Sequence, residues 1–129
     1  MRVTLFIGQV SLLISWASGC SQPGFLLTKI IDRQDAIPGA TVPFATIGDA
    51  SFDGTHVAFA GSGSGDAHGG IYGWSSSGGL TAIVGDGQSA PGTDGAAFAN
   101  FSSYQGVPSV KGGQLAFRAG LSTGNVGIF

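Results

Sequence analysis

Short apolar runs alternate with turns of glycine, serine and aspartate along most of the chain. VAFA, GIYGW and LTAIV follow one another between Gly54 and Val84. Val57 and Phe59 share one face of the first run, and this two-residue alternation is typical of a strand half-buried in a sheet. No window beyond the first twenty residues carries a convincing helical period. The pattern therefore predicts an all-β protein.

The runs occur twice. LTKIIDRQDAIPG at 27–39 aligns without gaps with LTAIVGDGQSAPG at 80–92, at an offset of 53. SFDGTHVAFAG, which begins at Ser51, then matches SVKGGQLAFRAG, which begins at Ser109, at an offset of 58. GIY at 70–72 finally matches GIF, which ends at Phe129, at an offset of 57. The offsets change only between apolar runs, where surface loops tolerate insertions. A repeat of this length indicates an array or a propeller.

Each copy supplies about four antiparallel strands, so we expect two units, residues 27–79 and 80–129, the second ending mid-repeat. In the first unit the strands are predicted at Leu27–Ile31, Phe44–Ile47, His56–Ala60 and Ile71–Trp74. In the second unit they are predicted at Leu80–Val84, Phe101–Tyr104, Gln114–Ala119 and Val126–Phe129. Asp53-Gly54 and Gly112-Gly113 are predicted to form hairpin turns with positive φ.

The motif S-F-D-G-x-x-V-A-F, followed by a glycine-rich turn, G-I-Y and G-G-L-T-x-I-V, resembles the bacterial TolB-type, WD40-like β-propeller repeat. The resemblance covers Leu27 to Phe129 and implies propeller-like units on an exported bacterial protein of unknown function. Two units do not close a ring, because propellers need four to eight blades. We expect a fragment of a longer propeller-like protein, with an assembly of several chains or a small β-sandwich as the alternatives. Further repeat units or self-association are expected to close the sheet array.

The first nineteen residues are predicted to be a signal peptide. Met1 and Arg2 precede an apolar run to Trp16, and the small residues of ASGC follow. ASGC resembles a bacterial lipobox, which makes Cys20 the candidate lipidation site and membrane anchor, although Ala17 stands where leucine is usual. An ordinary signal peptide is the alternative. Residues 20–26 are expected to form a short linker.

The amino-acid composition excludes several classes of structure and of binding site. The chain of 129 residues has 24 glycines, 9% charged residues and no glutamate. The solvent-exposed face of a surface helix normally carries glutamate and lysine, so few surface helices are expected. Its net charge of −2 and scattered lysines and arginines exclude a phosphate-binding surface, so nucleic acid is not an expected partner. One cysteine excludes an intramolecular disulfide and any multi-cysteine zinc site.

Two glycine-rich segments imitate functional motifs. GDGQSA at 85–90 fits G-x-G-x-x-A after a strand, but Pro91 and Gly92 replace the helix that a dinucleotide site requires. GSGSGDAHGG at 61–70 fails the register of calcium-binding nonapeptides and misses G-x-S-x-G. Both are interpreted as loops.

The remaining candidates are few. His56 is interpreted as a solvated strand residue because its counterpart is Gln114, and His68 with Asp66 is the alternative metal or acid–base pair. All seven acidic residues lie in turn-like contexts that already explain aspartate: Asp32, Asp35, Asp49, Asp53, Asp66, Asp86 and Asp94. Four aromatic side chains are candidates for a sugar- or peptide-binding surface, with the core as the favoured interpretation: Tyr72, Trp74, Phe101 and Tyr104.

No catalytic, cofactor or metal constellation is visible in the sequence. The hypothesis is a non-catalytic exported repeat protein that serves as a structural or ligand- or protein-binding module at the bacterial cell envelope. It is expected to be either a cell-envelope lipoprotein or a secreted or periplasmic protein. The alternative is a fragment of a propeller hydrolase or glycosidase whose catalytic residues lie outside this chain. A calcium-stabilised module is a third interpretation.

Overall fold

The computed structural model describes residues 28–101 and 106–129, and these residues contain nine strands and no α-helix. The predicted all-β class is confirmed. Strands β1–β4 form one antiparallel sheet in chain order; their bounds are Thr46–Phe52, His56–Ser62, Gly70–Ser75 and Gly79–Gly85. A single 3-10 turn, η1 (Ser64–Asp66), connects β2 to β3. The arrangement is open and is consistent with either a partial propeller or a sandwich.

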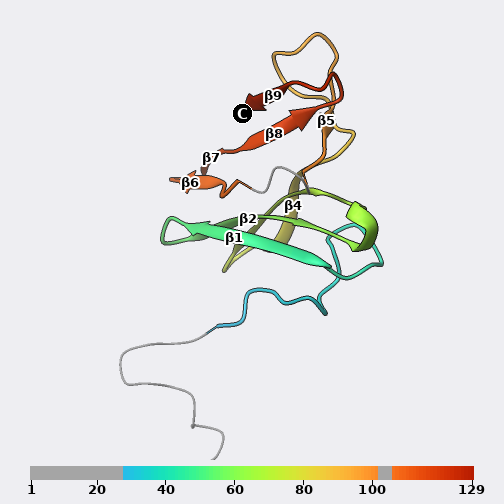
Figure 1. Ribbon diagram of the computed structural model, residues 1–129. Helices are drawn as coiled ribbons and strands as arrows, with labels where there is room; N and C mark the ends of the chain where they lie inside the picture. The colour runs from blue at the N-terminus through green and yellow to red at the C-terminus, as the bar shows by residue number, and fades with distance from the viewer. Residues whose placement is uncertain (1–27, 102–105) are drawn as a thin grey trace, which may run out of the picture.

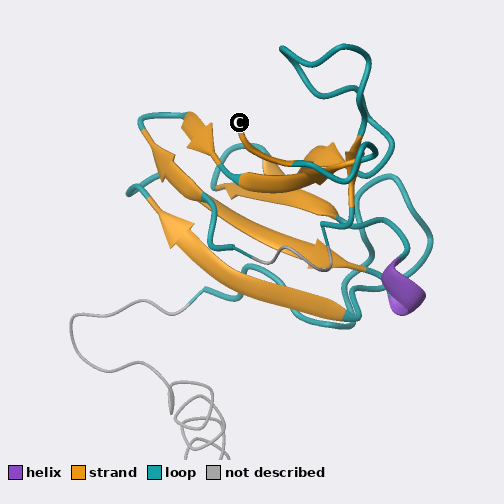
Figure 2. Ribbon diagram, turned by 45° about the horizontal axis from the view of Figure 1, so that its top comes forward, coloured by secondary structure: helices purple, strands orange, loops and turns teal. Residues whose placement is uncertain are grey.

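The second group of strands lies above this sheet (Figure 1). A three-stranded sheet has the order β5-β8-β9, and β6 and β7 form a separate hairpin. The strands are β5 (Phe98–Ala99), β6 (Ser109–Lys111), β7 (Gln114–Ala116), β8 (Arg118–Leu121) and β9 (Val126–Ile128). Figure 2 shows the two groups as stacked layers of strands, with loops at both ends.

The two groups repeat the same pairings. Phe59 lies opposite Tyr72 in the β2–β3 pair, and their aligned residues Phe117 and Phe129 exchange two backbone hydrogen bonds of 2.9 Å. Around these residues two matching aromatic triads form. The first is Phe44, Phe59 and Tyr72 and the second is Phe98, Phe117 and Phe129, with edge-to-face centroid distances of 4.9 and 4.8 Å. The internal repeat found in the sequence is therefore a repeat of packing.

Each triad belongs to one apolar cluster. The first cluster adds Ile37 and Val57, and the residues before β1 cover it from one side of the first sheet. The second cluster holds the aligned residues Ala90 and Leu115, and it also takes Ile71 from the opposite face of the first sheet. Alternation along the strands therefore divides the first sheet between two cores.

One predicted strand is wrong. Residues 28–31 form no strand, although their copy at 81–84 lies within β4. β4 pairs with β3, whereas no strand among the described residues lies beside 28–31. A strand requires a hydrogen-bonded neighbour, and local sequence cannot supply one. Ile30 and Ile31 nevertheless pack against the first cluster.

Three other predicted strands differ from the observed ones. The strand predicted at Phe44–Ile47 begins at Thr46 and extends to Phe52 as β1. The strand predicted at Gln114–Ala119 is split into β7 and β8, because its partner strand is split into β5 and β6. Between Phe98 and Ser109 the second copy holds four residues more than the first, as the offset rises from 54 to 58. Phe101 lies in a turn, and the rest of the strand predicted at Phe101–Tyr104 lies outside the described residues.

The boundary of the first hydrogen-bonded sheet does not coincide with the boundary between the two sequence repeats. β4 belongs to the first sheet, yet it opens the second unit as the sequence alignment defines it, at residue 80. Val84 of the same strand packs against the second cluster. β4 thus joins the two groups, by hydrogen bonds to one and by side-chain packing to the other.

Candidate functional site

The turn between β1 and β2 holds a positioned carboxylate. Asp53 Oδ1 accepts hydrogen bonds from the backbone N–H groups of Thr55 and His56, at 3.0 and 2.8 Å, and from the Thr55 hydroxyl at 3.0 Å. Asp53 Oδ2 accepts a bond of 3.3 Å from the N–H of Gly113, sixty residues away in the β6–β7 turn. Gly54 has a φ of +104°, a backbone conformation that glycine adopts without steric cost and that the tight turn requires, as the sequence predicts. The carboxylate therefore ties the two hairpins together.

These donors stabilise the charged form of the carboxylate. The N–H of Thr55 is the main cause and that of His56 the next, and together they hold the pKa of Asp53 far below its ordinary value of 3.8. Only 5% of the Asp53 side chain is exposed. The site therefore contains a fixed negative charge through the physiological pH range.

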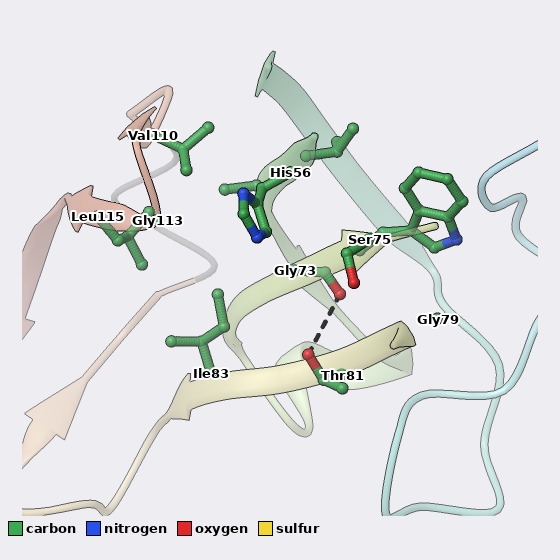
Figure 3. Close-up of a pocket in the computed structure, with 12 residues that line it drawn as sticks. His56, Gly73, Ser75, Gly79, Thr81, Ile83, Val110, Gly113 and Leu115 are labelled. Carbon is green, nitrogen blue, oxygen red and sulfur yellow. Dashed lines mark hydrogen bonds between the residues drawn. The ribbon is translucent and has the colours of Figure 1, made fainter. Parts of the chain in front are cut away.

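The imidazole of His56 lies directly beside this carboxylate. Its Nδ1 is 3.3 Å from Asp53 Oδ2 and 2.9 Å from the Thr55 hydroxyl oxygen. A carboxylate at one ring nitrogen fixes the orientation of the ring and leaves the other nitrogen available. Figure 3 shows the ring directed into the space between the β6–β7 hairpin and β3.

That space is a pocket of about 170 Å³ between the two groups of strands. Ala58, Gly73 and Ile83 of the first sheet line one side, and Val110 and Leu115 of the hairpin line the other (Figure 3). Ser75 and Thr81 add hydroxyl groups, and the Thr81 hydroxyl donates to the Gly73 carbonyl at 3.4 Å. The pocket is an apolar slot with one oriented imidazole at its rim.

The volume limits what the pocket can hold. Sites for whole small molecules are commonly 300–1,000 Å³, so about 170 Å³ accepts one group of a larger ligand, on the order of a single side chain. The apolar walls favour burial of a hydrocarbon portion, and His56 can hydrogen-bond to a polar atom beside it.

A second hollow of about 170 Å³ lies next to His68 and Asp86. The Tyr72 hydroxyl donates to the His68 carbonyl at 2.5 Å. Burial, and then the charge of Asp86, raise the pKa of Tyr72. Asp86 Oδ1 in turn accepts the N–H of Phe101 at 3.2 Å. The first bond ties the β2–β3 connection to β3, and the second ties the turn after β4 to the second group of strands, so both have a structural role. The side chain of Asp66, the predicted partner of His68, lies outside what is described.

One pair of carboxylates comes together, and its chemistry is that of a surface ion pair. Asp32 and Asp35 both contact Lys29 Nζ, at 2.9 and 3.1 Å, with half-exposed side chains. The hydrogen bond from Lys29 lowers the pKa of Asp32, whereas a general acid at neutral pH needs a raised one. Within residues 28–101 and 106–129 no cluster of three His, Cys, Asp or Glu side chains could hold a metal ion.

The other candidates are placed as follows. Tyr72 and Phe101 are 3% and 1% exposed, which confirms the core interpretation for both, and Trp74 packs against the first cluster. Tyr104 and the predicted lipidation site Cys20 lie outside the described residues. Gly85 ends β4 and a turn follows, so no helix begins at the GDGQSA segment. In the described part of the chain no helix is long and apolar enough to cross a membrane.

Sequence reasoning missed the association of His56 with Asp53. The signal was present as D-G-T-H, because an aspartate at the start of a tight turn accepts backbone N–H groups two and three residues on. The β6–β7 hairpin that completes the pocket could not be placed from sequence.

The comparisons with known proteins bear on the family alone. Neither the curated proteins nor the solved structures gave a match. A family model described as "Family of unknown function (DUF7453)" matches residues 16–129, which is most of the chain and includes both copies of the repeat. The protein therefore belongs to this family of unknown function.

Proposed function

We propose that this chain is a non-catalytic repeat module that acts by binding, exported from a bacterial cell and held at its envelope. The observation that carries the binding role is the pocket between the two repeat units, with apolar walls and the oriented His56. Its size suits one apolar group of a protein or carbohydrate ligand.

The export role rests on the sequence of the first twenty residues. The apolar run before Ala17-Ser18-Gly19-Cys20 supports a signal peptide, and Cys20 is the proposed lipid-bearing residue. Several acyl chains anchor a protein stably while one chain does not, so membrane attachment depends on full lipid modification.

A second candidate is hydrolysis. The Asp53–His56 pair favours it, because a carboxylate that orients an imidazole is one element of general-base catalysis. The Thr55 hydroxyl contacts His56 at Nδ1, the ring nitrogen that also faces Asp53, whereas a nucleophile would be activated at Nε2. A hydrolase would therefore require a nucleophile from elsewhere, as in the alternative of catalytic residues outside this chain.

One set of variants tests the proposal. His56→Gln installs the residue found at the aligned position 114, and Ala58→Leu fills the wall of the pocket. The probes are a panel of simple sugars and short apolar peptides, and the readouts are the His56 ring signals in NMR and the thermal midpoint. We expect one probe class to raise the thermal midpoint of the parent chain. A ligand that binds only the folded state, at a concentration of a hundred times its Kd, raises the free energy of unfolding by about 2.7 kcal/mol. Both variants should lose this gain.

Ester or glycoside turnover that disappears in His56→Gln would support the hydrolase instead. In bacterial cells the Cys20→Ser chain should leave the membrane fraction while the parent remains there. Equal partitioning of the two would contradict the lipid anchor without affecting the pocket.

A further inference from the structure

The outer face of the second unit exposes residues whose aligned partners are buried. Ile71 is 1% exposed and Ala58 is also 1% exposed, because both lie on the face of the first sheet that the second unit covers. Their counterparts Ile128 and Ala116 are exposed, Ile128 at 73%. Ile128 is the most exposed of the large apolar residues described. The second unit therefore presents a face that the first unit buries.

The outer side of the first unit shows the complementary difference. A hollow of about 350 Å³ opens beside its cluster, lined by Ile31, Ile47 and Phe59 among others. In the second unit the aligned residues are Val84, Phe101 and Phe117, and they belong to the cluster that receives Ile71. The hollow on the first unit is thus equivalent to the place on the second unit where Ile71 packs.

Phe52 marks the same side of the first unit. It is 65% exposed and pairs with Val57, which also lines the hollow. Its counterpart Val110 is half-buried in the pocket between the two units. Phe52 and Ile128 are the two most exposed large apolar side chains described, and their strand registers place them on opposite outer sides of the stack.

The backbone repeats this complementarity. β3 is flanked by β2 and β4, whereas its copy β9 pairs with β8 alone among the described strands. The copy of β4 is the segment 28–31, which packs on the first unit as Val84 packs on the second but belongs to no sheet. The β3–β4 register, Gly70 with Gly85 and Ile71 with Val84, translates into Gly127 with Asp32 and Ile128 with Ile31.

We propose that a second copy of this chain docks head-to-tail on the second unit. Ile128 of one copy enters the hollow of the next, and residues 28–31 of that next copy add to the edge of β9 as a fourth strand. The same contacts already hold the two units of one chain together, so the proposed interface continues the internal one.

This contact uses different surfaces on the two copies. It is therefore heterologous, and repetition gives a ring if the rotation closes and a filament if it does not. Edge addition through backbone hydrogen bonds is a common mode of strand recognition. Each chain carries both contact surfaces, the outer face of the second unit and the hollow side of the first unit. A substitution can therefore disable one surface and leave the other intact.

The test uses the full chain with Ile128→Lys, which disables the second unit's outer face, and Phe52→Lys, which disables the hollow side. Both positions are exposed, so both variants should keep the parent circular dichroism spectrum. In sedimentation velocity the parent should associate with rising concentration. Each variant alone should raise the dissociation constant about tenfold or more, because it places a charge in an apolar contact. Val107→Lys is the control, because Val107 is an exposed apolar residue that neither lines the hollow nor belongs to β8 or β9, and this variant should behave as the parent.

Mixing the variants gives the decisive result. One intact half remains on each, so an equimolar mixture of Ile128→Lys and Phe52→Lys should form heterodimers that grow no further. Hydrogen exchange should show the amides of 127–129 and 28–31 slowing together on association. A parent chain that stays monomeric, variants that associate like the parent, or a mixture that stays monomeric would each overturn the proposal. Association through the first twenty residues would be recognised by its insensitivity to both variants.

Discussion

At the scale of single residues, Asp53 does more than close a hairpin. Its carboxylate accepts backbone N–H groups from its own turn and from Gly113 in the opposite hairpin, and it orients His56. One side chain therefore couples the β1–β2 turn, the β6–β7 turn and the rim of the pocket. The aligned position in the second unit is Lys111, which cannot accept these hydrogen bonds, so the second unit does not repeat this coupling there.

Asp53 should make stability depend on pH in the acid range. Its pKa is lowered on folding, so its stabilisation is fully present above the ordinary value of 3.8 and is lost as pH falls toward the folded-state pKa. Asp53→Asn keeps the shape of the side chain without the charge. We expect the thermal midpoint of the variant to lie below that of the parent at neutral pH, and the gap to narrow steadily at acid pH. Asp49→Asn, at an exposed position of β1, controls for the loss of one negative charge. A gap that is independent of pH would contradict the prediction.

At the scale of elements, the molecule is built from one hairpin framework used twice. The triads Phe44–Phe59–Tyr72 and Phe98–Phe117–Phe129 have nearly the same geometry, with interplanar angles of 83° and 81° for the edge-to-face pairs. Their surroundings differ, because Phe59 is 1% exposed while Phe117 is half-buried. The two triads are therefore expected to contribute different amounts to the free energy of unfolding.

Removing the aligned rings of Phe59 and Phe117 should show this difference. Phe59→Ala should lower the free energy of unfolding by about 3–5 kcal/mol, the range for a buried phenylalanine, because it leaves a cavity against two rings. Phe117→Ala should cost clearly less, since solvent already reaches its ring. Urea denaturation of the two variants measures both values at equal chain concentration. Equal losses, or a larger loss for Phe117→Ala, would show that the second unit stabilises the fold more than its burial indicates.

At the scale of the whole molecule, position in the stack decides what a residue does. Ile71 and Ile128 are aligned residues in equivalent strands, yet one lies between the two units and the other faces outward. The first sheet has both faces covered, by the residues before β1 on one side and by the second unit on the other. The second group of strands has one face covered.

The same substitution at these two positions should therefore have opposite outcomes. Ile71→Lys buries an unpaired charge between the units and should abolish cooperative unfolding or lower stability by several kcal/mol. Ile128→Lys should change the stability of the monomer by about 0.5 kcal/mol or less, as is usual at exposed positions. Thermal unfolding at low chain concentration, where association is negligible, compares the two. A comparable loss in both variants would contradict the stacking of the second unit on the face that carries Ile71.

Much of this architecture could be predicted from the sequence, and particular residues show where prediction stopped. The strands at His56 and Ile71, and the positive φ of Gly54 and Gly112, follow from local alternation and turn chemistry. The segment 28–31 has the same local character as β4 and still forms no strand. The difference is the neighbour, because a strand is stabilised by hydrogen bonds to another segment.

The sequence by itself determined the all-β class, the two copies and the tight turns, because two-residue alternation and glycine-containing turns are local properties. Only the tertiary structure decided which strands pair, that β4 completes the first sheet while packing on the second unit, and that His56 faces a pocket beside Asp53. These features depend on contacts between residues far apart in the chain, such as the bond between Asp53 and Gly113. Burial makes such contacts specific, since the same apolar residue stabilises the fold where a neighbour covers it and remains at the surface where none does.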